Sequence, residues 1–458
     1  MGIENYDAII IGSGQGGNPL AQQLAKRRER VALIESEELG GTCINTGCTP
    51  TKTLVASAQV AHYARNAARW GVHTNAVTVD MNAILRRKSE IVESMRSGWE
   101  KQVNGEGYPD LYRGRARFTG PKTLQVKEQV LVGRKVFIDT GSAPAIPRIE
   151  GIDSVPFLTN LSMLEQRDLP KHLLVLGGGY IGMEFAQIFR RFGSDVTVIQ
   201  DSSQILPHED PEIAAELQKA LEGEGIRFKL NMRTSKICNE QGSISILFGG
   251  GTAEKVTGSH LLVATGRTPQ TADLELAKGG VEIDAKGFIK VNDRLETSAP
   301  DVWAIGDVKG GPAFTHISYN DFQIIYGNVY EGANFSVKTR IVPYAVFTDP
   351  ALGRVGMTEK EARAQGKKLK IGSVPMSSVA RAKERAETAG LMKLVVDAET
   401  DKILGAAFLT SAGDETVQMM SALILADKPY TLLKGAIYIH PTFAEGLFAL
   451  MDSVKVVN

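Results

Sequence analysis

Cys43 and Cys48 are two of only three cysteines in the 458-residue chain, and four residues separate them. The intervening Asn-Thr-Gly favours a bend that would bring the two sulfur atoms within disulfide distance. Lys52 follows Cys48 by one helical turn, where its charge and a helix N-terminus would both favour a thiolate. The pattern predicts a redox-active dithiol. Two buried free thiols and a metal site are the alternatives, although no second cluster of cysteine or histidine lies nearby in the sequence.

Two glycine-rich segments have the spacing Gly-x-Gly-x-x-Gly, at positions 12–17 and 177–182. Each follows an apolar run typical of a strand and precedes helix-forming residues, and a second predicted strand then leads to Glu35 or Gln200. In such a βαβ unit the first glycine permits a tight turn, the second lets a pyrophosphate approach the backbone, and the third lets helix and strand pack. The helix N-terminus offers free N–H groups to the phosphates. The chain is therefore predicted to bind two dinucleotides, or one dinucleotide beside a degenerate copy of the site.

A dithiol and two dinucleotide folds in one chain have a common chemical explanation. A sulfur pair alone does not accept a hydride, but a dinucleotide with an isoalloxazine ring can pass two electrons from a nicotinamide to a disulfide. The cysteine pair follows Glu35 of the first fold by a few residues. We therefore expect a flavin dinucleotide and a nicotinamide dinucleotide in the same chain.

The composition excludes several kinds of partner. Lysine plus arginine and aspartate plus glutamate each number 52, and no block of like charge stands out. This balance argues against nucleic acid or an anionic membrane surface as the main partner. The N-terminal segment has no basic run before its short apolar stretch, and the apolar runs fall well short of the ~18 residues of a membrane helix. Three cysteines do not form a secreted disulfide framework, so the expected location is the reducing cytoplasm.

The chain beyond residue 338 has a different pattern and no nucleotide signature. Before it, two apolar runs end in small residues, Ala-Thr-Gly-Arg267 and Ala-Ile-Gly-Asp307, as a strand does where it reaches a ligand. Together these patterns predict an α/β chain with two Rossmann-like dinucleotide-binding domains and a C-terminal α+β domain. The expected C-terminal strands are 340–348, 391–397 and 403–409, and the expected helices are 416–426 and 444–452.

These motifs resemble those of the flavoprotein pyridine-nucleotide–disulfide oxidoreductases, a family that includes glutathione reductase, dihydrolipoamide dehydrogenase and mercuric reductase. The resemblance runs through the whole chain. It rests on both glycine fingerprints, Gly-Gly-Thr-Cys-x-Asn-x-Gly-Cys-x-Pro-x-Lys, Ala-Thr-Gly-Arg, Ala-Ile-Gly-Asp and a C-terminal His-Pro-Thr-x-x-Glu. It implies an FAD-binding domain in two parts, residues 1–145 and 266–337, around an NAD(P)-binding domain at 146–265. Residues 338–458 would form the dimerisation domain.

The same resemblance assigns residues to the two cofactors, FAD and NADH or NADPH. Lys52 and Glu184 would pair beside the flavin as part of the catalytic set, and Tyr180 would cover the nicotinamide pocket. The residues implied for FAD are Gly12, Gly14, Gly17, Glu35, Gly41, Thr42, Lys52, Ala116, Asp307 and Thr315. Those implied for the nicotinamide coenzyme are Gly177, Gly179, Tyr180, Gly182 and Gln200, and Gly266 and Arg267 belong to a further loop at the cofactor sites.

The resemblance also implies catalytic roles. Cys48 would face the flavin, and Cys43 would attack the substrate. His440 would act as general acid and base for the exchanging thiol, held by Glu445, because histidine titrates near neutral pH. In relatives this histidine comes from the partner subunit, which implies a homodimer built on the C-terminal domain.

Several substrates fit these motifs. The arginine pair that holds glutathione in glutathione reductases is replaced here by residues 20–23, Leu-Ala-Gln-Gln, and no cysteine pair stands near the C-terminus as in mercuric reductases. We predict the reduction of a small disulfide. A soft-metal (mercuric or copper) reductase, a dihydrolipoamide dehydrogenase and a redox-sensing flavin protein with little turnover are the alternatives. Gln200 stands where NAD-specific enzymes have an acidic residue, so the use of either NADH or NADPH is expected.

Overall fold

The computed structural model describes residues 2–103, 107–249 and 254–457. These residues divide into two compact units, each assembled from segments that are far apart in the sequence. Unit 1 comprises Met1–Thr53, Leu85–Ala145 and Gly266–Arg340, and unit 2 comprises Leu54–Ile84, Ile146–Thr265 and Ile341–Asn458. The four-segment division expected from the sequence is finer than this one and stays a prediction.

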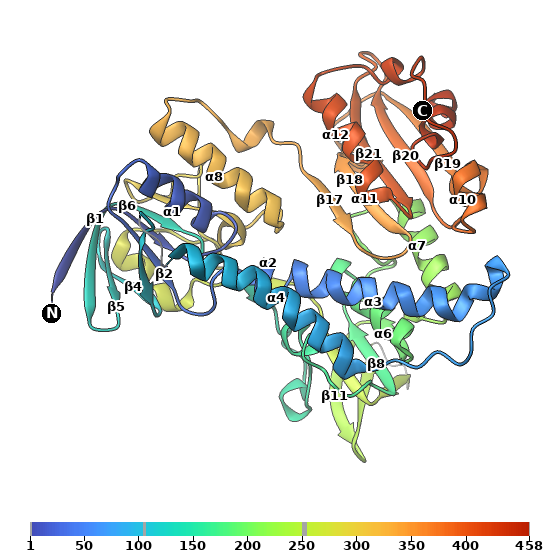
Figure 1. Ribbon diagram of the computed structural model, residues 1–458, viewed down its shortest axis with the longest axis horizontal. Coiled ribbons are helices and arrows are strands. Elements are labelled where there is room, and N and C mark those ends of the chain that lie inside the picture. The colour runs from blue at the N-terminus through green and yellow to red at the C-terminus, as the bar shows by residue number, and fades with distance from the viewer. Residues whose placement is uncertain (1, 104–106, 250–253, 458) are drawn as a thin grey trace. The chain divides into compact units, whose positions relative to one another are not determined.

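Unit 1 is built on one seven-stranded sheet (Figure 1). Its strands are β1 (Ile3–Ile11), β2 (Val31–Glu35), β3 (Asp110–Arg113), β4 (Ala116–Gly120), β5 (Thr123–Val126), β6 (Gln129–Ile138) and β16 (Val302–Ala304). They follow the order β3-β2-β1-β6-β5-β4, and β16 also pairs with β6. The strands β3, β2, β1, β6 and β16 run parallel, whereas β4 and β5 continue the sheet in antiparallel fashion. The parallel part is the arrangement that the first glycine fingerprint predicted.

The alternation of side chains along β1 shows how this sheet is covered on both faces. Ala8 and Ile10 point to one face of the sheet, where they pack with α1 (Gly17–Lys26) and α8 (Thr315–Tyr330). These two helices contact each other over that face (Figure 1). Ile9 and Ile11 point to the opposite face, into a core shared with β4 and β5. Both faces are buried at the end of β1, and its last four residues, Ala8–Ile11, therefore form a continuous apolar run rather than an alternating one.

Helix α1 ends before the helix-forming residues of its segment do. The helix-forming segment continues to Arg30, but the helix itself ends at Lys26. Arg28 adopts a left-handed conformation with φ of 63°, and the N–H of Glu29 donates to the carbonyl of Leu24. This turn satisfies the last carbonyls of the helix and reverses the chain towards β2.

The nucleotide-fold part of unit 2 has four parallel strands in the order β10-β9-β8-β14. They are β8 (His172–Leu176), β9 (Asp195–Ile199), β10 (Arg227–Lys229) and β14 (His260–Val263). Leu173 and Val175 of β8 pack with α6 (Tyr180–Phe192), whereas Leu174 faces a three-stranded antiparallel sheet. That sheet consists of β11 (Thr234–Glu240), β12 (Ser243–Phe248) and β13 (Lys255–Gly258), and α7 (Pro211–Gly223) follows β9. Strand, glycine loop, helix and strand thus occur where the second fingerprint predicted them.

The C-terminal part of unit 2 is a six-stranded antiparallel sheet in the order β17-β18-β21-β20-β19-β22. Its strands are β17 (Pro343–Val346), β18 (Ala351–Gly356), β19 (Leu369–Pro375), β20 (Leu391–Asp397), β21 (Ile403–Thr410) and β22 (Lys455–Val457). The helices beside it are α9 (Glu359–Ala364), α10 (Ala380–Glu384), α11 (Gly413–Thr416), α12 (Gln418–Leu425) and α13 (Gly446–Ser453). The expected helix at 416–426 is therefore two short helices, and three strands were not predicted. An α+β architecture is present as expected.

The cysteine-bearing segment folds as two consecutive helices, α2 (Gly41–Asn45) and α3 (Cys48–Asn66), and α4 (Met81–Val103) comes next in the chain. The division between the two units falls within both α3 and α4. Within the described ranges, neither these long helices nor any other is apolar enough over a sufficient length to cross a membrane.

Candidate active site

The break between α2 and α3 brings the predicted thiol pair together in unit 1. Cys43 lies in α2, and Cys48 is the first residue of α3. Both residues are thiols, and that of Cys43 is hydrogen-bonded to that of Cys48. The Sγ atom of Cys48 also lies 3.3 Å from the Oγ1 atom of Thr315, the first residue of α8. The pair is therefore arranged for disulfide chemistry, and two helices begin beside it.

The surroundings of the pair act on the pKa of Cys43 in two directions. The hydrogen bond to Cys48, burial and the charge of the neighbouring sulfur raise this pKa, and they outweigh the Thr315 hydroxyl and the Lys52 ammonium, which lower it. The net effect is a pKa well above that of an ordinary cysteine. Because the thiolate is the nucleophile, a thiol that keeps its proton needs a base before it can attack a disulfide.

The first glycine loop has no room for side chains. A Cβ atom on Gly12 would lie 2.2 Å from the carbonyl oxygen of Asp139, and one on Gly17 would lie 2.3 Å from the carbonyl oxygen of Gly12. A Cβ atom on Gly14 would lie 2.7 Å from the Asp139 carboxylate. Gly12 also has φ of 105°, a conformation that costs little only for glycine. The loop therefore presents bare backbone at the start of α1, as a pyrophosphate site requires.

Other residues expected at FAD meet this loop. The Glu35 carboxylate accepts hydrogen bonds from the backbone N–H of Ser13 at 2.9 Å and from its hydroxyl at 2.6 Å. Gly41, which opens α2 with φ of 59°, approaches so closely that a Cβ atom on it would lie 3.0 Å from the Cα atom of Gly14. Thr42 follows and is exposed. The glycine loop and the helix that carries Cys43 are thus neighbours within unit 1.

A third group of expected residues forms a hydrogen-bonded cluster at Asp307. The Ser142 hydroxyl donates to the Asp307 carboxylate at 2.6 Å, and Arg267 Nε donates to the same hydroxyl at 2.7 Å. Arg267 Nε also lies 3.6 Å from Asp307 Oδ2, and Gly266 before it has φ of 135°. Ala116 is buried at the start of β4. The bare loop, the acid that ends β2 and this polar cluster fit an FAD, and these residues would hold it.

Sequence reasoning missed Asp139, which lies beneath the glycine loop. Its Oδ2 atom accepts the N–H of Gly17, the first residue of α1, at 2.7 Å. Burial raises the pKa of Asp139 well above its usual value, and Asp307, Asp321 and Glu35 add to the rise, whereas the hydrogen bond from Gly17 opposes it. An acid directly after the apolar residues Val136–Ile138, at the end of a strand that reaches the site, was the signal that could have found it.

We expect Asp139→Asn to flatten the pH dependence of stability. Because its native-state pKa is raised, this carboxyl contributes stability in acid that is lost as the pH rises through that pKa. The loss is up to about 1.4 kcal/mol for each pH unit of that range. Asparagine does not ionise, yet its amide oxygen can still accept the N–H of Gly17. Thermal unfolding of flavin-free protein over a pH series should show both proteins alike in acid and the variant more stable in alkali. Parallel curves would contradict this assignment.

The second glycine loop, in unit 2, is closed to side chains at two of its glycines. Cβ atoms on Gly177 and Gly182 would lie 2.4 Å from the carbonyl oxygen of Ala264 and 2.1 Å from that of Gly177. Gly179 has open space beside it, and Tyr180 begins α6 directly after it. The open side therefore lies at the start of a helix, where the pyrophosphate of a nicotinamide coenzyme is expected.

Gln200 completes the second loop in the way that Glu35 completes the first. Its Oε1 atom accepts the N–H of Gly178 at 2.7 Å, and its Nε2 atom donates to Asp201 Oδ1 at 3.0 Å and to Ser202 Oγ at 2.7 Å. The amide oxygen thus provides the acceptor that an acid would provide, without the negative charge.

The remaining expected residues are placed within their own units. Glu184 is buried in α6 and accepts the N–H of Phe347 at 2.9 Å in unit 2, whereas Lys52 belongs to unit 1, so their pairing stays a prediction. The Nδ1 atom of His440 lies 2.9 Å and 3.0 Å from the two carboxylate oxygens of Glu445. The histidine side chain is 67% exposed. A carboxylate that holds Nδ1 orients the ring for proton transfer at Nε2.

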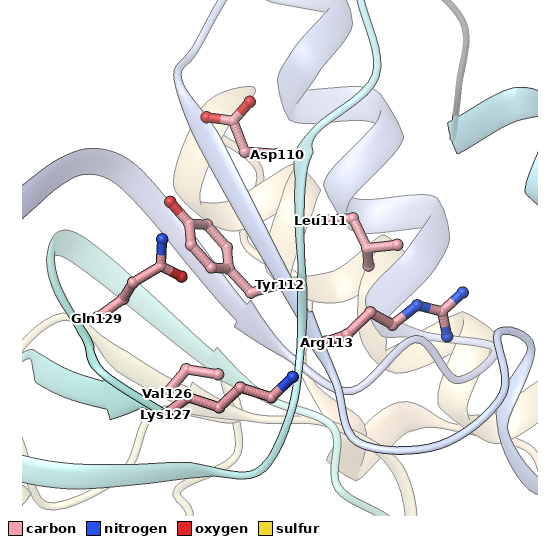
Figure 2. A pocket seen from close by; sticks show the side chains of 7 residues that line it. All are labelled: Asp110, Leu111, Tyr112, Arg113, Val126, Lys127 and Gln129. Carbon is pink, nitrogen blue, oxygen red and sulfur yellow. The ribbon is translucent and has the colours of Figure 1, made fainter.

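A polar hollow of about 480 Å³ lies elsewhere in unit 1, along the edge strand β3 (Figure 2). The residues that line it are Asp110, Leu111, Tyr112, Arg113, Val126, Lys127 and Gln129. Asp110 and Tyr112 are both hydrogen-bonded to the hydroxyl of Tyr6, at 2.8 Å and 2.6 Å. None of the expected catalytic residues lines the hollow, and among the described residues no group of three or more His, Cys, Asp or Glu could hold a metal ion.

Known proteins are similar to this chain along most of its length. Residues 6–321 match the family profile described as "Pyridine nucleotide-disulphide oxidoreductase", and residues 342–450 match the dimerisation domain of the same description. The probable pyridine nucleotide-disulfide oxidoreductase RclA of Escherichia coli is 36% identical over 99% of this chain and 100% of its own length. A mercuric reductase of Bacillus cereus is 36% identical over 97% of this chain and 71% of its length. A dihydrolipoyl dehydrogenase of Thermus scotoductus is 34% identical over 99% and 98%.

Solved structures give the same result. The HOCl-induced flavoprotein disulfide reductase RclA from Escherichia coli is 36% identical, with a TM-score of 0.88 over 98% of this chain and 100% of that chain. A structure described as a Cu(II) complex of that reductase has a TM-score of 0.89 at 35% identity, over 98% and 99%.

Proposed function

Because the chain belongs to the pyridine nucleotide-disulphide oxidoreductase family, we propose that Cys43 and Cys48 form its redox-active disulfide and reduce a small disulfide at the expense of NAD(P)H. The observation that carries this proposal is the contact of the two thiols with each other and with Thr315, next to the first glycine loop.

Membership confirms the general predictions. The α/β fold class, the enzyme class acting on sulfur groups and the cofactors FAD and NAD(P)H are those of the family. When bound, FAD supplies a ring system that takes up two electrons from reduced nicotinamide and yields them to sulfur. The roles of individual residues, the substrate and the coenzyme preference belong to the proposal.

The thiol pair performs the exchange in two substitutions. Cys43 attacks one sulfur of the substrate disulfide, so that a mixed disulfide forms and the first substrate thiolate leaves. Cys48 then attacks the Cys43 sulfur, which releases the second substrate thiolate and closes the Cys43–Cys48 disulfide. His440 removes the proton from Cys43 and returns it to the departing thiolate. Two electrons from NAD(P)H, with one further proton, restore the dithiol.

The His440–Glu445 pair favours a disulfide as the substrate. A departing thiolate needs a proton, and a histidine oriented by a carboxylate is suited to provide it. A metal ion reduced by the same thiols would leave no thiolate and would need no such acid. The pair also argues against a redox sensor with little turnover. The dihydrolipoyl dehydrogenase relative keeps the lipoyl group, whose oxidised form is a cyclic disulfide, among the candidate substrates.

One contact favours a soft metal ion as a second candidate substrate. The Met95 thioether lies 3.6 Å from the Oγ1 atom of Thr49, the residue after Cys48, and Met95 is 47% exposed. A thioether at the residue next to Cys48 would add a soft donor to the two thiols, which suits copper or mercury. The relatives named as mercuric reductases, and the reductase solved as a Cu(II) complex, point to the same alternative.

A substrate panel separates these candidates. NAD(P)H oxidation by the purified holoenzyme would be followed with small disulfides, oxidised lipoamide, and Hg(II) or Cu(II) salts, each with wild type and His440→Ala. A disulfide reductase should lose its turnover in the variant. Fast metal reduction that is equal in wild type and variant, together with no disulfide turnover, would replace the disulfide proposal by the metal one.

The exposed apolar side chains near His440 support a homodimer in which this histidine serves the partner's thiols. Ile437 is 100% exposed and Ile439 is 80% exposed. Phe448 in α13 is 54% exposed. Exposed large apolar groups this close to a proposed catalytic residue suit a surface that a second copy covers. The dimerisation-domain match over residues 342–450 supports the same assembly. The reducing cytoplasm is the proposed location, since thiols persist there.

We expect Gln200→Glu to shift the coenzyme preference towards NADH. The new carboxylate can keep the hydrogen bond from Gly178 but would repel the 2′-phosphate of NADPH. A repulsion of 1–2 kcal/mol corresponds to a change of about tenfold. The ratio of kcat/KM for NADH to that for NADPH should therefore rise about tenfold or more. Gln218→Glu, in α7, makes the same charge change at a glutamine outside the glycine loop and should leave the ratio unaltered. An equal ratio in both variants would remove Gln200 from coenzyme selection.

A further inference from the structure

Two consecutive residues of helix α4, Met95 and Arg96, contact the stretch of chain from Asn45 to Thr49, which contains Cys48. The Nε atom of Arg96 donates to Asn45 Oδ1 at 3.1 Å, and Asn45 lies between the two cysteines. The Sδ atom of Met95 accepts from Thr49 Oγ1, directly after Cys48. The helix therefore holds the segment on both sides of Cys48.

The side chain of Asn45 links Arg96 to the backbone that precedes Cys43. Its Nδ2 atom donates to the carbonyl oxygens of Leu39 at 2.9 Å and Gly41 at 3.0 Å. A primary amide has one accepting end and one donating end. A guanidinium that engages the accepting end therefore fixes the direction of the donating end. Gly41 opens α2 in a left-handed conformation, so this hydrogen bond helps to set where α2 begins.

The other contacts of Arg96 are weaker. Its Nη1 atom lies 3.7 Å from Glu38 and 3.6 Å from Glu93, and both carboxylates are mostly exposed. Exposed ion pairs contribute little to stability. The Arg96 side chain itself is 23% exposed, and its hydrogen bond to Asn45 is charge-assisted and partly buried. The contact with Asn45 is therefore the one through which Arg96 acts.

We propose that Arg96 is a positioning residue for the Cys43–Cys48 couple and, through Asn45, keeps the two sulfur atoms adjacent in the dithiol form. The inference rests on the proposed redox role of this pair. Adjacent sulfurs raise the effective concentration of one thiol at the other, which favours the disulfide over the dithiol. Without Arg96 the segment between the two cysteines gains conformational entropy in the dithiol form but not in the disulfide form, so the dithiol is favoured. The reduction potential of the couple should then become more positive.

The test measures the thiol–disulfide equilibrium of the pair in the FAD-loaded protein. In dithiothreitol redox buffers, the protein disulfide takes two electrons and two protons from the dithiol, which closes into its cyclic disulfide. Alkylation and mass spectrometry of the peptide with both cysteines give the reduced fraction. Arg96→Met should shift the equilibrium about tenfold towards the dithiol, which corresponds to a potential about 30 mV more positive.

Two further variants make the test specific. Arg96→Lys keeps the charge without the planar guanidinium and should shift the equilibrium in the same direction but less, and it carries the test if Arg96→Met does not fold. Arg87→Met is the matched control, because Arg87 lies on the same helix and donates to the carbonyl of Thr53, beyond the stretch from Asn45 to Thr49 that Met95 and Arg96 contact. Its equilibrium should equal that of wild type.

The outcomes separate this inference from the function on which it rests. A normal wild-type couple with an unchanged Arg96→Met would overturn the inference alone. An equal shift in Arg87→Met would also overturn it, because any lost arginine of α4 would then have the same effect. A wild-type pair that forms no disulfide in any buffer would overturn the proposed function itself.

Discussion

Cys48→Ser is expected to trap a mixed disulfide with the substrate, whereas Cys43→Ser is expected to form none. If Cys43 is the attacking thiol, it bonds to one substrate sulfur, and Cys48 is the thiol that resolves the bond. The Cys48→Ser variant therefore lacks the resolving thiol, and the Cys43→Ser variant lacks the attacking thiol. Both should lose NAD(P)H-dependent disulfide reduction by about 10³-fold or more, because groups that act as one unit fail together.

Intact mass after incubation of the reduced variants with a small disulfide gives the adduct directly. The measurement is needed because exposure alone would suggest Cys48 as the attacking thiol: Cys48 is exposed, whereas Cys43 is half-buried. Cys238→Ser is the control, since this third cysteine lies in β11 of unit 2, and its turnover should equal that of wild type. An adduct in Cys43→Ser and none in Cys48→Ser would exchange the two roles.

The parts of the site that the sequence predicted are those fixed by local sterics. At Gly12 the left-handed φ and the carbonyl 2.2 Å from a would-be Cβ exclude every other residue, so the spacing of the loop is visible in the sequence. The dithiol was visible for a similar reason, because four intervening residues suffice to bend Cys43 back to Cys48. Gln200 stood out in the sequence because an acidic residue was expected at its position. Its amide oxygen accepts the N–H of Gly178, which explains why the loop tolerates glutamine in place of an acid.

The parts that the sequence did not predict depend on contacts between distant segments. Thr315 meets Cys48 across 267 positions, Asp139 meets Gly17 across 122, and Arg96 meets Asn45 across 51. No local periodicity encodes such a contact. The resemblance pointed to Thr315 as a flavin neighbour, but its contact with a thiol became visible only in the fold.

The C-terminal sheet shows the limit of strand prediction. β20 and β21 are mostly buried and mostly apolar, and both were predicted. β19 contains a glycine, a serine and a terminal proline, and β22 is three residues long, so neither has the apolar period of a strand. They form because the ladder of β20 offers hydrogen bonds to β19, and β19 in turn to β22. Their strand character is imposed by pairing rather than by composition.

His440→Ala is expected to lower disulfide turnover by about 10² to 10⁴-fold, the usual contribution of a general acid–base residue. The reduction of the Cys43–Cys48 disulfide by NAD(P)H should remain intact, because that step needs no proton on a substrate thiolate. Thiol counts after addition of NAD(P)H alone, compared with turnover in the presence of a disulfide, separate the two steps. Glu445→Gln should give a smaller loss, because glutamine can still accept a hydrogen bond from Nδ1 but carries no charge. Equal damage to both steps would remove His440 from its assigned role.

A mixture of two inactive variants shows whether His440 acts within its own chain or across the dimer. In a heterodimer of Cys43→Ser and His440→Ala, the second chain has both cysteines and would receive the histidine of the first, so one of its two sites would be complete. Random exchange of subunits makes half the dimers mixed, and activity should recover to about a quarter of wild type if the site is shared. Differently tagged chains, isolated as heterodimers, remove the dependence on mixing. Isolated heterodimers without activity would place His440 at the thiols of its own chain, and the exposed residues around it would then need another explanation.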